Sequence, residues 1–233
     1  MMQSLIIHMA TAHARKANVE TLCQTLPDAH VVDAQSGEEC VTRPGDLHTP
    51  NYPFAMNKGE IGCTRSHRKC WQWIVDQDVE YALICEDDLS IDHAIWQQAM
   101  VLVAQYANAD SFIRLPAKAR DKPIKNIDTN GAARLFVPKT IGLQTVCQVV
   151  GKNAAKALLK ATEELDRPVD TLLQMHWVHG QKIHTIFPNG VKELTQELGG
   201  STIQKKTITG QKLSREIKRK WYRWLVASKP QEA

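Results

Sequence analysis

Short apolar runs alternate along the chain with longer segments in which apolar residues recur at helical spacing. The runs predict strands at residues 4–9, 30–34, 81–85, 111–115, 145–150 and 182–187. Helical patterns fill the intervals at residues 11–26, 59–77, 92–106, 152–165 and 169–179. This alternation predicts an α/β fold with a mostly parallel central sheet.

The run at residues 81–85 is apolar throughout and stops abruptly at three acids, Glu86, Asp87 and Asp88. A continuously apolar strand is typical of a sheet covered on both faces, and ligand crevices lie beyond such strand ends. Adjacent carboxylates repel one another, and oxygen ligands on a short turn suit Mg²⁺ or Mn²⁺. The triplet therefore predicts a metal and diphosphate site. The alternative is a polar loop that caps the next helix.

Residues 35–57 contain five of the chain's glycines and prolines and form a turn-rich stretch. A connection of this length between regular elements is typical of a functional loop. We expect part of the substrate-facing surface there.

The composition is that of a folded protein, with 43% hydrophobic and 23% charged residues. The length predicts one globular domain over residues 1–203 and a tail over residues 204–233. The six cysteines are irregularly spaced without a CxxC pair, so neither a disulfide framework nor a zinc site is expected. The start resembles no signal peptide and no run reaches about 18 apolar residues, which predicts a cytoplasmic protein.

The net charge of +4 is unevenly distributed. Nine Lys and Arg against two Glu give residues 204–233 a charge of +7 and leave −3 on the body, which argues against a nucleic-acid binder. Residues 211–228 predict a basic amphipathic helix that lies on an anionic membrane surface. The expected membrane contacts are Lys218, Arg219, Lys220, Trp221, Arg223 and Trp224. The alternative is a terminal helix that packs its tryptophans on the body.

Two blocks of sequence resemble glycosyltransferase family 25, which includes bacterial lipopolysaccharide and lipooligosaccharide galactosyltransferases. The first runs from Lys58 to His67 and has the pattern G-x-x-x-C-x-x-S-H, and the second is the strand that ends in Glu86-Asp87-Asp88. Weaker similarity extends from residue 6 to residue 203. The positions of His8 and of Cys147-Gln148 depart from the family pattern, which bears on the acceptor and the donor sugar.

The resemblance implies a Rossmann-like, GT-A-like domain that transfers a hexose, with galactose from UDP-galactose as the first candidate, to a lipid-linked oligosaccharide core at the inner membrane. It implies that Asp88 and Glu86 hold Mn²⁺ or Mg²⁺. The implied nucleotide-sugar contacts are Arg15, Asp33, Glu60, His67, Glu86 and Asp87. The family inverts the anomeric configuration, and its Pro-Val-Asp block makes Asp170 the candidate general base.

Each of these roles has a structural alternative. Arg15 is equally suited to a surface salt bridge, His67 to a satisfied place in the core, and Asp170 to a helix cap. His176, His179 and His184 lie close together in sequence without a zinc motif. At the level of function, the rivals are a metal-dependent phospho- or nucleotidyltransferase and a non-enzymatic membrane-binding module, although no phosphate-binding glycine motif supports the first.

Overall fold

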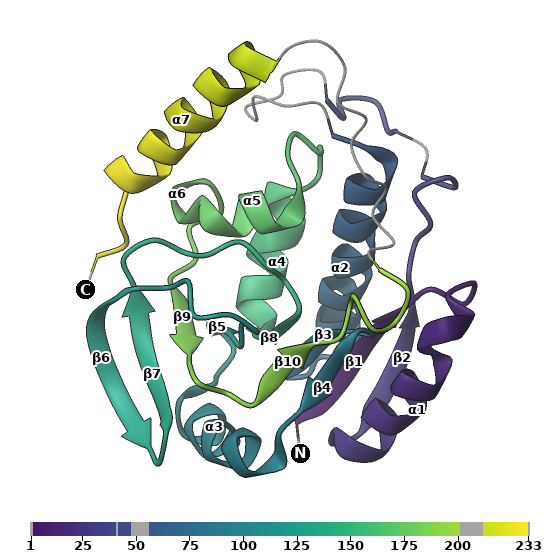
Figure 1. Cartoon of the computed structure of the whole chain (residues 1–233), viewed down its shortest axis with the longest axis vertical. Helices are drawn as coiled ribbons and strands as arrows, with labels where there is room; N and C mark the ends of the chain where they lie inside the picture. The colour runs from purple at the N-terminus through teal and green to yellow at the C-terminus, as the bar shows by residue number, and fades with distance from the viewer. Residues whose placement is uncertain (1, 41, 48–55, 201–211, 233) are drawn as a thin grey trace.

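The computed structural model of the chain describes residues 2–40, 42–47, 56–200 and 212–232. Its helices are η1 (His13–Arg15), α1 (Lys16–Thr25), α2 (Lys58–Asp76), α3 (His93–Tyr106), α4 (Lys152–Ala161), α5 (Val169–Gln174), α6 (His176–His179) and α7 (Lys212–Ser228). Its strands are β1 (Gln3–His8), β2 (Ala29–Asp33), β3 (Tyr81–Glu86), β4 (Leu89–Ile91), β5 (Phe112–Arg114), β6 (Pro123–Asn130), β7 (Ala133–Pro138), β8 (Cys147–Gly151), β9 (Ile183–Ile186) and β10 (Val191–Glu193). Figure 1 shows their arrangement.

Eight of these strands form one sheet in the order β2-β1-β3-β8-β5-β9-β7-β6. The predicted α/β class is confirmed, but the prediction of a mostly parallel sheet is wrong. The pairs β1/β2, β1/β3 and β5/β9 are parallel, whereas the other four pairs are antiparallel. The central strand β8 runs against both β3 and β5, so the sheet is mixed.

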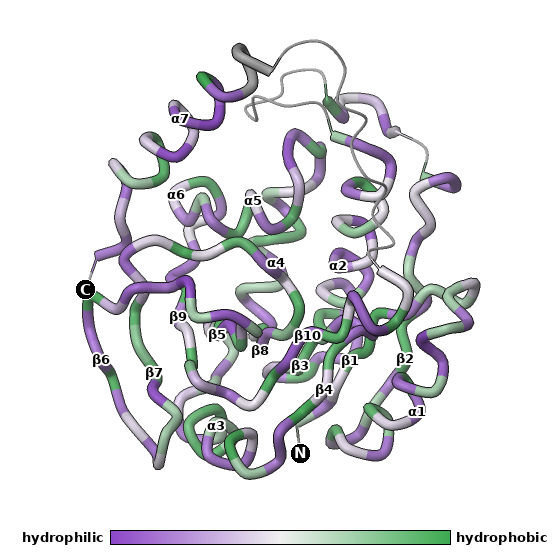
Figure 2. Tube along the Cα trace, in the orientation of Figure 1, coloured by the Kyte–Doolittle hydropathy of each residue, from purple (hydrophilic) through white to green (hydrophobic). Residues whose placement is uncertain are grey.

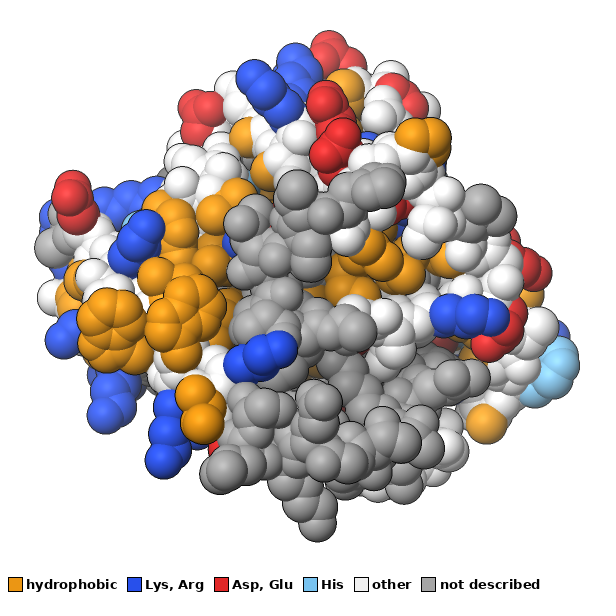
Figure 3. Space-filling view, turned by 90° about the horizontal axis from the view of Figure 1, so that it is seen from above, with side chains coloured by type: hydrophobic (Ala, Val, Ile, Leu, Met, Phe, Trp, Pro, Cys, Tyr) orange, Lys and Arg blue, Asp and Glu red, His pale blue; other side chains and the backbone are white. Residues whose placement is uncertain are grey.

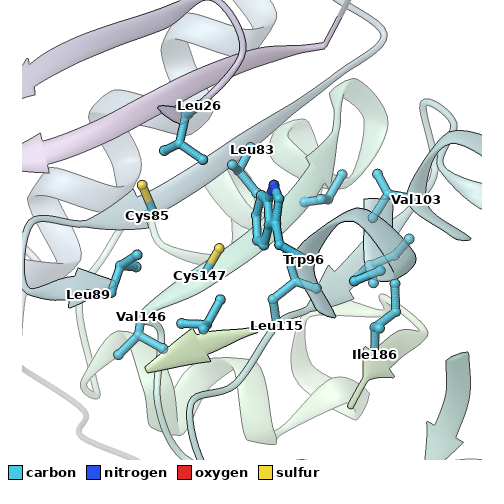
Figure 4. Packing of buried hydrophobic residues seen from close by; sticks show 14 of the residues in the cluster. Leu26, Leu83, Cys85, Leu89, Trp96, Val103, Leu115, Val146, Cys147 and Ile186 are labelled. Carbon is cyan, nitrogen blue, oxygen red and sulfur yellow. The ribbon is translucent and has the colours of Figure 1, made fainter. Parts of the chain in front are cut away.

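The strands bury apolar side chains on both faces of the sheet. In β3, Leu83 and Cys85 join one core cluster with residues of α1 and α3. Ala82 and Ile84 alternate with them and join a second cluster with residues of α2, α4 and α5. The helices therefore cover opposite faces of the sheet (Figure 1). Figure 4 shows Leu83 and Cys147 near Trp96 of α3, and Cys85 belongs to the same cluster.

The hairpin of β6 and β7 was not predicted. Most of β6 is exposed and polar, so it lacks the alternation that marks a half-buried strand. The Asn130-Gly131 pair at its turn, with Gly131 at φ 57°, is the signal that identifies it in the sequence. The predicted helix at 169–179 is also broken, at Met175, into α5 and α6.

Candidate active site

The acidic triplet lies where β3 ends, and Arg15 holds two of its carboxylates. The Arg15 guanidinium donates to Asp87 Oδ1 at 2.5 Å and lies 3.1 Å from Asp88 Oδ2. His8, at the end of the neighbouring strand β1, is 2.7 Å from Asp87 Oδ2 and must donate through Nδ1, because a carboxylate only accepts. Arg15 is 6% exposed, so it does not form a surface salt bridge.

Backbone contacts fix the turn that carries these acids. Asn18 Nδ2 donates to the carbonyls of Asp87 and Leu89, at 2.8 and 2.9 Å. Beyond the turn, β4 pairs with β10, and Leu194 N donates to the Asp88 carbonyl at 2.7 Å. The turn is thus held by hydrogen bonds from α1 and from the segment after β10, and it is not an isolated polar loop. Asp92 occupies the N-cap position of α3, but its side chain makes no capping hydrogen bond to the described residues.

The charges of this cluster fit a hard divalent cation. Three carboxylates face one arginine, which leaves two negative charges if the histidines are neutral. Asp88 Oδ2 accepts from Thr195 at 2.8 Å, whereas the buried Oδ1 has no hydrogen-bond partner among the described residues. Burial, and then the Glu86 charge, raise the pKa of Asp88. A cation beside Oδ1 would satisfy this atom and relieve the repulsion.

Glu86 has different surroundings. Its Oε1 accepts from Thr145 at 2.7 Å and lies 3.7 Å from His67 Nε2. Burial opposes its ionisation, but the contacts with His67 and Thr145 outweigh burial and lower the pKa of Glu86. Glu86 therefore stays charged. Its side chain is 28% exposed, which leaves it open to a ligand.

The first sequence block forms the start of α2 and has two pairs of residues at i and i+4. Ser66 Oγ donates to the Gly62 carbonyl and accepts from Gln35 N, each at 2.8 Å, and so ties the loop after β2 to the helix. Cys63 and His67 form the second pair and face Glu86. His67 is fully buried, and its Nδ1 is 3.1 Å from Gln148 Nε2.

Gly62 is needed for this close approach between loop and helix. A Cβ at this position would lie 2.5 Å from the Gln35 carbonyl oxygen. We expect Gly62→Ala to lower the free energy of unfolding by about 1–3 kcal/mol, because overpacking outweighs the helix propensity that alanine adds. Urea denaturation measures this. The control Gln72→Ala, on the exposed face of α2, should change it by less than about 0.5 kcal/mol, and a stabilised Gly62→Ala would contradict this packing role.

Two cavities meet at Glu86 and Cys63, which line both. The Arg15 cavity is lined by Ile7, Met9, Arg15, Ala34, Gln35, Gly37, Gly59, Cys63, Ser66, His67, Glu86 and Asp87. The Asp170 cavity is lined by Glu60, Cys63, Glu86, Gln144, Thr145, Val146, Pro168, Val169, Asp170 and Glu193. The loop after β2 contributes Gln35 and Gly37, whereas residues 41 and 48–55 of the expected substrate-facing loop lie outside the described residues.

Asp170 is the second residue of α5, and Pro168 occupies the cap position. Its Oδ1 accepts from the N–H of Thr171 at 2.7 Å. Burial raises the pKa of Asp170, the Thr171 contacts partly offset this, and the charges of Glu60 and Glu86 raise it further. A carboxylate with a raised pKa beside an open cavity has the property that a general base requires.

Two other candidate residues lie apart from the Arg15 cavity. Glu60 forms a capping box with Asn57, whose N–H donates to Glu60 Oε2 at 2.8 Å, and it lines the Asp170 cavity. Asp33 ends β2 one residue before the lining residue Ala34, and its own side chain is exposed. His179 and His176 hydrogen-bond to the carbonyls of Leu173 and Lys229, and among the described residues neither they nor His184 line these two cavities.

The tail helix α7 packs on the body through residues other than its tryptophans. Tyr222 and Val226 contact Met175, whereas Trp221 and Trp224 are 50% and 65% exposed. Figure 2 shows mainly hydrophilic residues along α7 with hydrophobic ones between them, and Figure 3 shows exposed hydrophobic side chains beside Lys and Arg on this face. The alternative that both tryptophans pack back on the body is therefore wrong. The predicted boundary at 203/204 lies outside the described residues.

A third cavity lies between part of α7 and the body, beside the contact of Tyr222 and Val226 with Met175. Its lining residues are Thr140, Leu143, Thr171, Gln174, Arg219, Tyr222, Arg223 and Val226. Two of the predicted membrane contacts, Arg219 and Arg223, thus line this α7 cavity. Another lining residue, Thr171, directly follows Asp170 in the sequence. In the described part of the chain, every helix is too short or too polar to cross a bilayer.

Sequence reasoning missed several residues of the site. It did not predict the hydrogen bond between His8 and Asp87. The other residues it missed are Asn18, Thr145, Thr195 and Cys63. Thr145 was missed because β8 is antiparallel to β3, which places the start of that strand, rather than its end, beside Glu86. His8 had a usable signal, since it ends a strand predicted to lie next to the acidic one.

Comparison with known proteins agrees with the two sequence blocks. Residues 1–173 match the profile of glycosyltransferase family 25 (LPS biosynthesis protein). The chain is 31% identical over 134 residues to a glycosyltransferase 25 family member of Drosophila melanogaster, covering 54% of this chain and 21% of that protein. It is 35% identical over 48 residues to human procollagen galactosyltransferase 2, covering 21% of this chain and 8% of that protein. The chain thus spans about a fifth or less of the length of these relatives.

Among solved structures, the chain is similar to a glycosyltransferase involved in glycosylation of the PBCV-1 major capsid, at a TM-score of 0.36 and 10% identity over 69% of this chain and 64% of that chain. It is also similar to a mannose-1-phosphate geranyltransferase from Thermus thermophilus, at a TM-score of 0.37 and 9% identity, covering 79% of this chain and 73% of that chain. The family assignment rests on the match over residues 1–173. The chain belongs to glycosyltransferase family 25.

Proposed function

We propose that the chain transfers a hexose, with inversion, from a UDP-sugar to a lipid-linked lipopolysaccharide or lipooligosaccharide core at the cytoplasmic face of the inner membrane. UDP-galactose is the first donor to test, because one relative is named a galactosyltransferase. The observation that carries the proposal is the position of Glu86, at the end of β3 and in the wall of two cavities. A GT-A-like arrangement, with donor and acceptor meeting at a strand end, accounts for this position.

The donor belongs in the Arg15 cavity. This cavity lies at the ends of β1 and β2, and Arg15 offers the donors that a diphosphate needs once its contacts with Asp87 and Asp88 rearrange. Asp88 and Glu86 are the residues that would hold Mn²⁺ or Mg²⁺, which when bound supplies Lewis-acid stabilisation of the leaving diphosphate. Asp33 and His67 remain proposed contacts of the ribose, the base or the diphosphate.

The acceptor belongs in the Asp170 cavity, where its hydroxyl can reach both Asp170 and a sugar held at Glu86. Asp170 takes the hydroxyl proton as the oxygen attacks C1, and the bond from C1 to the diphosphate breaks on the opposite side. The adjoining α7 cavity offers Arg219 and Arg223 to anionic groups farther along the acceptor. This arrangement favours a negatively charged oligosaccharide core.

The test is hydrolysis and transfer of a panel of nucleotide sugars with and without Mn²⁺. Metal-dependent release of nucleotide diphosphate supports the proposal. Transfer of a phosphoryl or nucleotidyl group would support the phosphotransferase alternative, and a protein that binds vesicles without any turnover would support a membrane-binding module.

The pH profile tests the role of Asp170. The base must be deprotonated, so the rate should rise with pH through the raised pKa of Asp170, above the usual value of about 3.9. Because the Glu60 charge contributes to this raised pKa, Glu60→Gln should shift the acid limb to lower pH while glutamine retains the capping box. A shift to higher pH would contradict the assignment. The exposed control Glu20→Gln should leave the limb in place.

Membrane attachment through α7 is tested by its exposed tryptophans. Deleting the tail would also remove Gln231, which hydrogen-bonds to Pro138 and to both the N–H and the carbonyl of Ile183. We therefore expect the double change Trp221→Ser and Trp224→Ser to weaken binding to anionic vesicles about tenfold or more without unfolding, because both side chains are half exposed or more.

Vesicle sedimentation at low and high salt measures this binding. Attraction through the basic residues should weaken as the Debye length falls from about 10 Å at 0.1 M to about 3 Å at 1 M. Val101→Ser, an equally exposed apolar position on α3, is the control and should bind as the unmodified chain does. Unchanged binding of the double variant would exclude α7 as the attachment site.

A further inference from the structure

The irregular cysteine spacing argued against a zinc site, but the fold assembles three ligands of mixed chemistry. Cys63 Sγ, a ring nitrogen of His67 and a carboxylate oxygen of Glu86 all lie within 4.8 Å of one another. Cys63 and His67 are one helical turn apart on α2, and Glu86 approaches them from the end of β3. Sequence spacing could not show this group, because its third member comes from a different element.

The surroundings of the His67 ring support a metal-binding role for this group. The side chain is fully buried, yet its Nε2 has no hydrogen-bond partner among the described residues. Its nearest carboxylate oxygen, Glu86 Oε1, is 3.7 Å away, which is too far for a hydrogen bond. A histidine nitrogen and a carboxylate oxygen about 2.0–2.2 Å from a tetrahedral zinc ion are about 3.3–3.6 Å apart, so this separation nearly fits two ligands of one ion.

Gln148 can orient His67 for this purpose. The amide lies 3.1 Å from His67 Nδ1. With its oxygen turned to the ring it would accept a hydrogen bond from Nδ1–H, which leaves the Nε2 lone pair free to bind metal. The second ring nitrogen of a metal-bound histidine usually has such a partner.

We propose that Cys63, His67 and Glu86 form a site for a borderline-soft divalent cation of the Zn²⁺ class, which shares Glu86 with the proposed hard-cation site but does not include Asp88. A thiolate and an imidazole favour such an ion over Mg²⁺ or Mn²⁺. Binding releases the thiol proton to solvent. Three protein ligands would leave the fourth position to water or an exchangeable ligand. Cys63 and Glu86 line both cavities, through which such a ligand could approach.

The site also gives the protein a means of inhibition, and this part rests on the proposed function. An ion that engages Glu86 occupies the wall shared by the donor and acceptor cavities. Zn²⁺ should therefore compete with Mn²⁺-supported transfer. The binding itself requires no transfer reaction, so it can be measured separately.

Co²⁺ titration of the full reduced chain tests the binding. The expected result is one Co²⁺ per chain with thiolate-to-cobalt charge-transfer absorption, which Zn²⁺ displaces. Cys63→Ser should abolish the charge-transfer absorption, whereas Cys23→Ser, a partly buried thiol on α1, should retain it. Gln148→Leu should weaken Co²⁺ binding about 10–100-fold, as expected for loss of a group that orients a ligand.

Asp88→Asn separates the two cation sites. It should retain the charge-transfer absorption, because Asp88 is not a ligand of this ion. Absence of thiolate absorption in the folded unmodified chain, or its persistence in Cys63→Ser, would overturn the proposed site. Thiolate absorption without inhibition of transfer by Zn²⁺ would support the site and contradict the proposed role of Glu86 in transfer.

Discussion

Replacing Asp88 with asparagine should abolish transfer and leave the protein at least as stable as before. Loss of the carboxylate removes the proposed metal ligand, which should slow the reaction about a thousandfold or more. Burial and the charge of Glu86 raise the pKa of Asp88, so its ionised form opposes folding at neutral pH. Asparagine removes that charge and keeps an oxygen that can accept from Thr195.

Steady-state transfer assays and thermal unfolding at pH 7 with and without Mn²⁺ measure the two effects. Mn²⁺ should raise the melting temperature of the unmodified chain but not that of Asp88→Asn. Asp76→Asn, at the exposed end of α2, serves as the control and should behave as the unmodified chain. Near-normal Mn²⁺-dependent turnover in folded Asp88→Asn would contradict the metal-binding role.

Replacing Asp170 with asparagine should lower the rate at saturating substrates by about two orders of magnitude or more, as loss of a general base does. Donor affinity should change little, because Asp170 does not line the Arg15 cavity. The fold should be retained, since asparagine can still accept from the Thr171 N–H, which is the contact that the carboxylate makes now.

Isothermal titration with UDP-galactose and pre-steady-state transfer assays separate binding from chemistry. The exposed loop residue Asp110, changed to asparagine, is the control and should alter neither quantity. If donor affinity collapses in Asp170→Asn while the saturated rate stays normal, Asp170 is part of the donor site and the base lies elsewhere.

The parts of the fold that could be predicted are those that the hydrophobic pattern determines. Strand β3 was predicted because both of its faces are buried, which requires an unbroken apolar run. Helix α2 was predicted from its spacing, and its capping box at Asn57 and Glu60 agrees with it. The hydrophobic pattern does not show whether a strand runs parallel or antiparallel to its neighbour, since an apolar strand has the same composition in either direction. The antiparallel course of β8 was therefore missed.

In the candidate site, too, some residues could be predicted from the sequence, whereas others depend on how the elements come together. The triplet, Arg15 and His67 were named from the sequence and its family resemblance, and the structure brings all of them to one place. Cys63 and Thr145 join them only because α2 and the start of β8 converge on Glu86. Glu60 lines the Asp170 cavity rather than the Arg15 cavity, and the exposed Asp33 adjoins the lining residue Ala34, so their contacts with the nucleotide sugar stay predictions.

Anomeric configuration tests the central claim most directly. The full chain would be incubated with UDP-α-galactose, Mn²⁺ and an isolated lipooligosaccharide core acceptor, and the new linkage would be examined by NMR spectroscopy. A β-linked galactose, formed only with metal and with release of UDP, is the result expected for in-line attack assisted by Asp170. An α-linked product, or galactose transfer that continues unchanged when both metal and the Asp88 carboxylate are removed, would contradict the mechanism.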